Sequence, residues 1–469
     1  MTAARAALAV AAAVIVAACA PATTPPVPSL ALPAAWKTEP PWREGTPRDA
    51  APKGRWWTRY GDDELAALQD RAQAANPTLA AASARLQQAR AFVAASEAGL
   101  FPQLGTTLRA ARQRISGNRP LTNYSNPNVP TVQNDYTLGF TASYEIDLSG
   151  RVRATIEGAR ASAEQVAADL ENTRLVLAAE LAADYFNLRE LDAELDVVQR
   201  SIALQRRALA FVSGRHELGA ASGLDVAQQQ ALLDNTLTQL DLLHRQRAQF
   251  EHAIATLVGT PAPSFAIEPA ARRATLPEVP LGVPSDVLER RPDVAAAERA
   301  MATANAQIGV ARAAFYPSVM LAPTYGVESR TVSHLFDAPS LVWSLGVSVA
   351  ESIFDGGRLR ANVDAAQAGY QVTAANYRRV VLGAMQEVED GIVGVAALTR
   401  ALQQAETAAA SANRVLALAG GRYEGGATTY LDVITAQQSV LASERQVAQL
   451  QGQLLLASVV LVKALGGDW

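Results

Sequence analysis

The longest regular pattern of apolar positions runs from about residue 150 to residue 213. Apolar residues recur there at intervals of seven, and a second apolar row lies four residues ahead of the first, as in the a and d positions of a coiled coil. No proline interrupts the stretch, and no glycine follows Gly158, so the predicted helix would be roughly 95 Å long. The rows are Leu181, Leu188, Leu195, Ile202 and Leu209, and Leu177, Leu191, Val198 and Val212.

Other helices are predicted on both sides of this stretch. Three glycines, Gly214, Gly219 and Gly223, predict a tight reversal, after which a return helix runs from Asp225 to Leu257. Near the start of the chain, a helix is expected from Asp62 to residue 75, followed by a second helix over residues 78–97.

Strict alternation of apolar and polar residues predicts two strands, one over residues 103–110 and one over residues 135–147. A soluble sheet with one wet face would alternate in the same way. Aromatic residues at both ends of the apolar face, and the complete polarity of the other face, favour a transmembrane β-barrel. The apolar face of the second strand consists of Tyr136, Leu138, Phe140, Ala142, Tyr144 and Ile146.

The chain contains an internal duplication with an offset of 207 residues. From the second strand onward Tyr136 falls on Trp343, Leu138 on Leu345, and the tip sequence from Arg215 falls on that from Arg422. The predicted lipid-facing positions therefore include Tyr136, Leu138, Phe140 and Tyr144 in the first copy, and Trp343, Leu345 and Val347 in the second.

The duplication sets the expected domain organisation. Residues 62–259 form the first repeat and residues 285–469 the second, joined by a proline-rich connector over residues 260–284. A signal peptide is expected over residues 1–18, followed by a proline- and tryptophan-rich segment over residues 19–61.

Charge and composition exclude several classes of protein. The 41 basic and 45 acidic side chains nearly balance, which argues against a nucleic-acid partner. The four histidines are scattered, and we expect no metal site and no cofactor other than covalent lipid.

Cys19 is the only cysteine, and it follows an apolar run that has the charged start and small-residue end of a secretory signal. Its position resembles a bacterial lipoprotein box, in which the thiol is acylated, with palmitate among the acyl groups. The alternative is a short transmembrane anchor, but thirteen apolar residues are too few to span ~30 Å of hydrocarbon.

Two strands in each copy give four strands per chain, which cannot close a barrel. An open edge in lipid would leave backbone groups unpaired at several kcal/mol each, so several chains must share one barrel. Two chains would give eight strands and a filled interior, whereas three would give twelve and a lumen lined by the polar strand face. The expected fold is mainly α with a membrane β-barrel part.

These features together resemble the TolC-like outer-membrane factors, in their lipoprotein, NodT-like branch. The resemblance rests on the lipid box, the Trp56-Trp57 pair, the stretches over residues 281–294 and 308–317, the sequence Phe354-Asp-Gly-Gly-Arg358 and the two tip motifs. It implies a homotrimer in the outer membrane, lipid-anchored and extending through the periplasm. It also implies the exit duct of a tripartite efflux or secretion system for small molecules, with a periplasmic adaptor and an inner-membrane pump of the RND type as partners.

The resemblance also assigns a gate to the tip. Asp432 matches the aspartate that rings the constriction, and Tyr423 and Asp225 match a tyrosine and an aspartate that tie neighbouring helix pairs shut. Thr435 stands where some relatives carry a second aspartate, which puts a second acidic ring in doubt. The alternative is that Asp225 and Asp432 are ordinary helix N-caps after glycine-rich turns.

Small residues at the two reversals predict an adaptor-docking surface, because they leave grooves for another hairpin. They could equally serve only to permit the turns. The predicted docking residues are Arg215, Gly219, Ala220, Leu224, Arg422, Gly426, Ala427 and Leu431.

Two other functions compete with an export duct. A lipid-anchored periplasmic coiled-coil spacer would have the same helices, with the strands forming a small soluble cap. An enzyme is disfavoured, because the sequence contains no nucleophile elbow, metal-ligand cluster or phosphate loop.

Overall fold

The computed structural model describes residues 54–114, 132–270, 275–277 and 290–467. The expected signal peptide, Cys19, most of the segment over residues 19–61 and part of the connector therefore lie outside the described residues. The described residues form two compact units. The first contains Leu86–Val166 and Ala297–Tyr377, and the second contains Ala167–Ala296 with the residues before Leu86 and after Tyr377. Each unit is thus built from both copies of the duplication.

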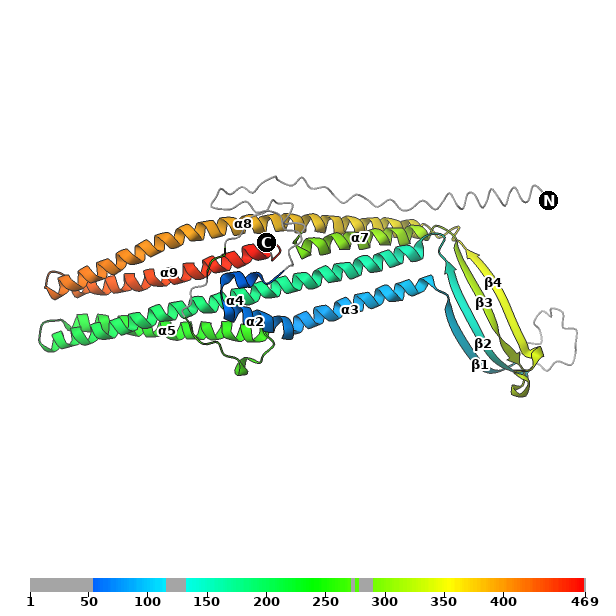
Figure 1. Cartoon of the computed structure of the whole chain (residues 1–469), viewed down its shortest axis with the longest axis horizontal. Coiled ribbons are helices and arrows are strands. Elements are labelled where there is room, and N and C mark those ends of the chain that lie inside the picture. The colour runs from blue at the N-terminus through cyan, green and yellow to red at the C-terminus, as the bar shows by residue number, and fades with distance from the viewer. Residues whose placement is uncertain (1–53, 115–131, 271–274, 278–289, 468–469) are drawn as a thin grey trace. The chain divides into compact units, whose positions relative to one another are not determined.

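The duplication appears as two pairs of helices of equal length (Figure 1). Helices α4 (Arg151–Glu217) and α8 (Arg358–Glu424) have 67 residues each. Helices α5 (Gly223–Leu257) and α9 (Tyr430–Ala464) have 35 residues each. The expected long helices and return helices are confirmed, although α5 begins two residues before Asp225.

Three shorter α-helices also lie within the described residues: α2 (Asp63–Ala75), α3 (Pro77–Glu97) and α7 (Pro292–Ala313). As predicted, Asp62 caps α2. Its carboxylate accepts hydrogen bonds from the backbone N–H groups of Glu64 and Leu65, which have no partners within the helix.

Four strands form one antiparallel sheet in the order β1-β2-β3-β4. They are β1 (Gln103–Arg114), β2 (Val132–Ile146), β3 (Ser318–Ser329) and β4 (Leu341–Ala350). Two strands per copy are confirmed. However, β1 ends later and β2 begins earlier than predicted, because the ladder between them continues to the pair Arg114↔Val132. Alternation of side chains marks only the part of a strand with one apolar face, whereas backbone pairing extends beyond it.

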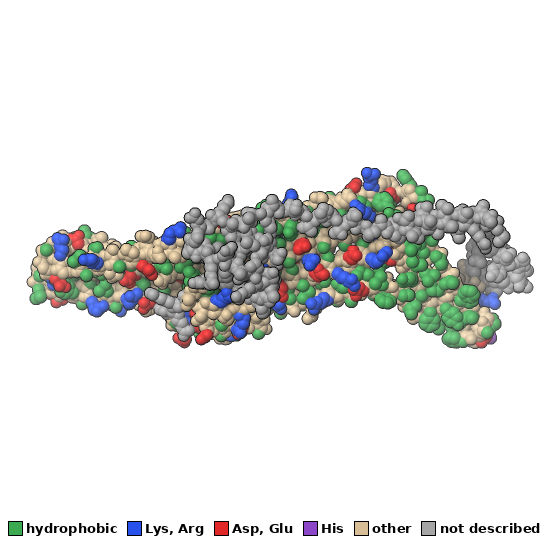
Figure 2. Space-filling model, turned by 45° about the horizontal axis from the view of Figure 1, so that its top comes forward, with side chains coloured by type: hydrophobic (Ala, Val, Ile, Leu, Met, Phe, Trp, Pro, Cys, Tyr) green, Lys and Arg blue, Asp and Glu red, His purple; other side chains and the backbone are tan. Residues whose placement is uncertain are grey.

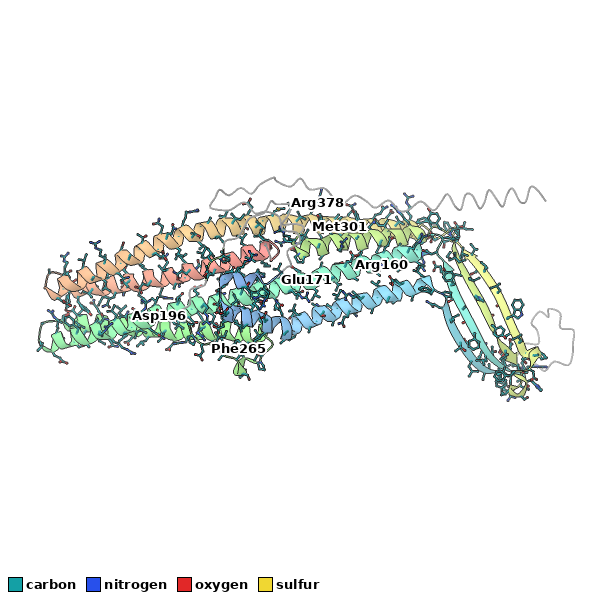
Figure 3. All side chains as sticks on the ribbon, viewed as in Figure 1. Arg160, Glu171, Asp196, Phe265, Met301 and Arg378 are labelled. Carbon is teal, nitrogen blue, oxygen red and sulfur yellow. The ribbon has the colours of Figure 1, made fainter. Side chains whose placement is uncertain are left out.

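The helices of the first unit pack closely against each other. A Cβ atom added to Gly158 of α4 would lie 3.3 Å from the Cβ of Ala306 in α7, so small residues permit this approach. Arg160 of α4, labelled in Figure 3, donates from Nε to Glu97 of α3 over 3.1 Å. Met301 of α7, also labelled there, belongs to a buried apolar cluster with Ile308 and Tyr370.

The core of the second unit contains the apolar rows predicted from the heptad pattern. Leu181 and Leu188 are fully buried in one cluster, and Leu195 and Ile202 continue in a second. Trp56, Trp57 and Tyr60, in the short 3-10 helix Trp56–Tyr60, join the first cluster. The heptad interpretation is therefore confirmed as a packing seam.

A buried ionic network lies beside this core. Asp192 accepts from Arg189 Nη1 at 2.7 Å and from Arg247 Nε at 2.6 Å, which joins α4 to α5. Arg247 also donates to the backbone carbonyl of Ile267 at 2.6 Å, and the N–H of Ala270 donates to Asp192 at 3.2 Å. Glu64 also pairs with Arg189 and Glu251 with Arg247, so each buried arginine faces a second carboxylate, as burial of charge requires.

Glu190 lies near the same network but shares its surroundings with another acid. Burial, and then the neighbouring Glu194, raise the pKa of Glu190 to about 7. Because the folded chain holds this proton more tightly than the unfolded chain, its stabilising contribution is complete below about pH 4 and is lost as the pH rises through about 7.

We therefore expect Glu190→Gln to raise the free energy of unfolding by about 1–2 kcal/mol at pH 8, after allowance for partial exposure, and to leave it unchanged at pH 4. Denaturant unfolding at the two pH values measures this. Glu171→Gln is the control, since the side chain of Glu171 (Figure 3) is 44% exposed and pairs with Arg174. Equal effects of Glu190→Gln at both pH values would contradict the prediction.

Among the described residues, α9 is the one helix long and apolar enough to cross a membrane by length and composition. Its apolar side chains have another role, because Val459, Leu461 and Val462 are buried in the helical core. The hydropathy of α9 is accounted for by this packing.

Candidate functional site: the helix reversals and the sheet

The two helix reversals have the same backbone geometry. Gly219 and Gly426 adopt φ values of 74° and 70°, in the left-handed region that favours glycine. The N–H of Ala220 donates to Arg215 O, and that of Ala427 to Arg422 O, each over 2.8 Å. These bonds close helices α4 and α8 with a C-terminal glycine turn. The glycines are therefore required by the turns, whatever else contacts them.

Hydroxyl residues, not the aspartates, occupy the N-cap positions of the return helices, and only Ser222 makes a side-chain cap bond. The N-caps are Ser222 and Thr429, and Asp225 and Asp432 each lie three residues further on. The alternative that both aspartates are N-caps is wrong, because a serine or threonine at the cap lets an acidic residue at the third helical position bond back to it. Asp225 and Ser222 form a capping box with both of its hydrogen bonds. The Asp225 carboxylate accepts from Ser222 N at 2.9 Å, and the Asp225 N–H donates to Ser222 Oγ at 3.2 Å.

Asp432 is an exposed carboxylate held by two hydroxyl groups. It accepts a hydrogen bond from Thr428 Oγ1, and another from Thr429 Oγ1 over 3.2 Å. The bond from Thr428, followed by the contributions of Thr429 and Arg422, lowers the pKa of Asp432 below its ordinary value. The group is therefore negative at neutral pH.

Tyr423 contacts both a cation and a second aromatic ring. The Arg215 guanidinium carbon is 5.1 Å from the centre of the Tyr423 ring, within the range of a cation–π interaction. Tyr423 also contacts the Tyr430 ring at a centroid distance of 4.9 Å. Tyr423 thus links the end of α4 to the start of α9.

A buried polar chain beneath Tyr423 was not predicted. The Tyr430 hydroxyl donates to Gln229 Oε1 at 2.8 Å, and Gln229 Nε2 donates to the backbone carbonyl of Gln205 at 3.2 Å. Burial, with the nearby Tyr423 and Asp225, raises the pKa of Tyr430 above its ordinary value, so the hydroxyl keeps its proton. The chain joins α9, α5 and α4.

Apolar packing joins the same helices. Val212 of α4, Leu232 of α5 and Val433 of α9 belong to one cluster with Tyr430, and Leu416 of α8 packs against it. The two helical hairpins of one chain are therefore held together near their ends by both apolar and polar contacts.

Seven of the eight predicted docking residues are exposed, and the eighth is not. Arg215 is half-buried against Tyr423, and its Nε has no hydrogen-bond partner in the described part of the chain. Leu218, which the sequence interpretation omitted, is 85% exposed. The exposed seven are Gly219, Ala220, Leu224, Arg422, Gly426, Ala427 and Leu431.

The sheet presents a continuous apolar face. The register places Phe140 opposite Tyr325 and Tyr325 opposite Trp343, in a row across three strands. Trp343 and Leu345 are 72% and 70% exposed, and Figure 2 shows hydrophobic side chains gathered over this region. The predicted lipid-facing residues Tyr136, Leu138, Phe140, Tyr144, Trp343, Leu345 and Val347 all share this face.

The opposite face of the sheet is polar, with Thr324 Oγ1 and Ser344 Oγ in a hydrogen bond of 2.7 Å. The outer strands β1 and β4 each pair with only one neighbour among the described residues. The two free edges need strands to pair with, and the large apolar face needs an apolar environment. A single copy of the chain supplies neither.

Within the described residues, no group of three or more His, Cys, Asp or Glu side chains could hold a metal ion.

Comparison with known proteins agrees with this geometry. The model of the family described as "Outer membrane efflux protein" matches residues 68–260 and 283–467. The pyoverdine export outer membrane protein OpmQ of Pseudomonas putida is 33% identical over 450 residues, which cover 95% of this chain and 94% of that protein. The toluene efflux pump outer membrane protein TtgF of Pseudomonas putida is 30% identical, with 88% and 85% covered.

A solved structure shares the fold as well. The outer-membrane channel OprN superposes with a TM-score of 0.85 and 27% identity, over 95% of this chain and 98% of that chain. The mainly helical fold with a four-stranded sheet is that of the TolC-like channels, as the sequence predicted.

Proposed function

Because the chain belongs to the outer membrane efflux protein family and acts in export across the outer membrane, we propose that three copies form one continuous duct. The observation that carries this proposal is the four-stranded sheet with two free edges and one exposed apolar face. Twelve strands from three copies would pair every edge and place the apolar face in lipid. The polar face would then line the lumen.

The trimer is testable with the purified protein. We expect a mass three times that of the chain by light scattering, a species that changes its electrophoretic mobility on heating, and ion conductance in planar bilayers. The spacer hypothesis expects the helices but no conductance. A monomer without conductance would refute the duct.

We assign the tip, defined as the segments Arg215–Val226 and Arg422–Val433, to the periplasmic end of the duct. Three copies of Asp432 around one axis would form a negatively charged ring, which repels anions and attracts cations. The Arg215–Tyr423–Tyr430 contacts would hold the closed state, and Asp225 would support the closed tip beside Tyr430. The exposed small and apolar tip residues would receive a periplasmic adaptor that connects the duct to an RND-type inner-membrane pump.

Cargo is expected to depend on the pump and adaptor. Two relatives of similar sequence are named for different cargoes, one for pyoverdine export and the other for toluene efflux. A polar lumen without a specific binding pocket would pass many small molecules, so we expect the duct to contribute little selectivity.

Cys19 is expected to carry the lipid that anchors the mature N-terminus in the outer membrane. Cys19→Ala should remove the acyl chains and leave the protein in the membrane fraction after carbonate washing, because the barrel remains inserted. Metabolic labelling with palmitate measures acylation, and the wild type is the control. Release of the variant into the soluble fraction would instead favour the spacer.

A further inference from the structure

We propose that Arg112 and Arg114, at the loop end of β1, bind the phosphate groups of an anionic lipid in the outer leaflet of the outer membrane. The inference rests on the proposed function, because it requires the sheet to span that membrane with its hairpin loops outward. It concerns the outward face of the barrel, not the lumen or the tip.

The strand register places both arginines on the apolar face. Side chains two residues apart in a strand share a face, so Arg112 and Arg114 continue the row that contains Leu104 and Leu108. Across the ladder, Arg112 pairs with Asn134 and Arg114 with Val132, two and four residues beyond Tyr136. Both arginines are exposed.

The length of the apolar face places these arginines at the depth of lipid headgroups. Tyr136 and Ile146 mark the ends of the apolar row on β2, and the ten steps between them span roughly 34 Å along a strand. With a tilt of about 40°, this corresponds to a height of about 26 Å, close to the apolar band of outer-membrane barrels. Arg112 and Arg114 would then lie roughly 5 and 10 Å above the band.

Among the described residues of this face, no carboxylate balances the two charges. The paired residues are Asn134 and Val132, and the acidic residues nearby, Asp135 and Glu328, alternate onto the opposite face. Asp135 there accepts a hydrogen bond of 3.1 Å from Thr137. In the described part of the chain neither arginine has an ion-pair partner, and the sequence of residues 115–131 contains no aspartate or glutamate.

Two uncompensated guanidinium groups just above an apolar band suit a lipid that carries phosphate. Arginine binds phosphate through two parallel N–H bonds, and basic side chains at a membrane surface attract anionic headgroups. The apolar band below would hold the acyl chains of the same lipid, which a free anion cannot use.

The test compares lipid binding by matched variants of the full-length trimer. Trimers in phosphatidylcholine nanodiscs are titrated with lipid A, and bound lipid is counted by native mass spectrometry. Arg112→Gln with Arg114→Gln should weaken binding about 25-fold, from roughly fivefold for each arginine. Arg109→Gln is the control, because Arg109 lies on the same strand but on the opposite face; its binding should match that of the wild type.

Further binding measurements, with other ligands and with a lysine variant, identify the ligand. Lipid A without its phosphates should bind like the double variant, and millimolar inorganic phosphate should not displace lipid A. Arg112→Lys with Arg114→Lys, which keeps the charge, should retain most of the binding if the glutamine variant fails to assemble. Equal binding by the wild type and the double glutamine variant, an equal loss in Arg109→Gln, or displacement by free phosphate would overturn the proposal. Failure of the wild type to form heat-modifiable trimers would instead refute the duct itself.

Discussion

Replacement of Asp192 by alanine is expected to lower the free energy of unfolding by about 3–5 kcal/mol, because it leaves two buried arginines without their shared carboxylate. The Asp192 side chain is 1% exposed, and those of Arg189 and Arg247 are 5% and 10% exposed. The lost bond to Ala270 N would also loosen the segment that follows α5.

Denaturant unfolding of the purified protein and the amount of protein in the membrane fraction measure this effect. Asp196→Ala is the matched control, four residues later on the same helix (Figure 3), where the side chain is 55% exposed and pairs with Arg200. We expect that control to change stability by less than about 0.5 kcal/mol. A similar small change in both variants would show that the buried network contributes little.

The second large effect is expected at the tip, where Tyr423→Ala removes the ring that contacts Arg215 and Tyr430. If both contacts are made only in the closed state, their loss lowers the free-energy preference for the closed state by about 2 kcal/mol. The open fraction then rises roughly 30-fold. Single-channel conductance in planar bilayers and susceptibility to large antibiotics measure the change.

Two further variants separate the possible causes. Tyr423→Phe keeps the ring and removes the hydroxyl, so it should behave like the wild type if the ring contacts hold the gate, and like Tyr423→Ala if a bond from the hydroxyl does. Asp432→Ala should reduce the preference for cations. Unchanged resting conductance in both Tyr423→Ala and Asp432→Ala would refute the gate assignment.

The sequence predicted the elements well because the repeating patterns are local. The heptad row through Leu181 and Leu188 required burial every seven residues, and the structure buries both. The alternation through Tyr136 and Phe140 required one apolar strand face, and the register provides it. The periods of helices and strands involve only residues close together in the chain, so they can be recognised in the sequence before the tertiary structure is known.

The contacts that hold the tip and the core were not predicted, because they join residues far apart in the chain. Gln229 bonds Tyr430 across 201 positions, and Arg247 bonds Asp192 across 55. A glutamine or an arginine on a helix is ordinarily a surface residue, so its type alone does not indicate a buried bond. The cap positions were misassigned for a related reason, since an aspartate can serve either at the cap or three residues after it.

The equal lengths of α4 and α8 restrict how this protein can change in size. Insertion of one residue into α4 alone would rotate everything beyond it by about 100° and shift it by ~1.5 Å, which would turn its buried heptad rows out of the packing seam. Seven residues inserted only in α4 would restore the seam but displace one reversal by roughly 10 Å, which would separate Arg215 from Tyr423. The helical part of the duct can therefore be lengthened only by adding the same number of whole heptads to both copies of the duplication. A change of length in one copy alone would not be tolerated.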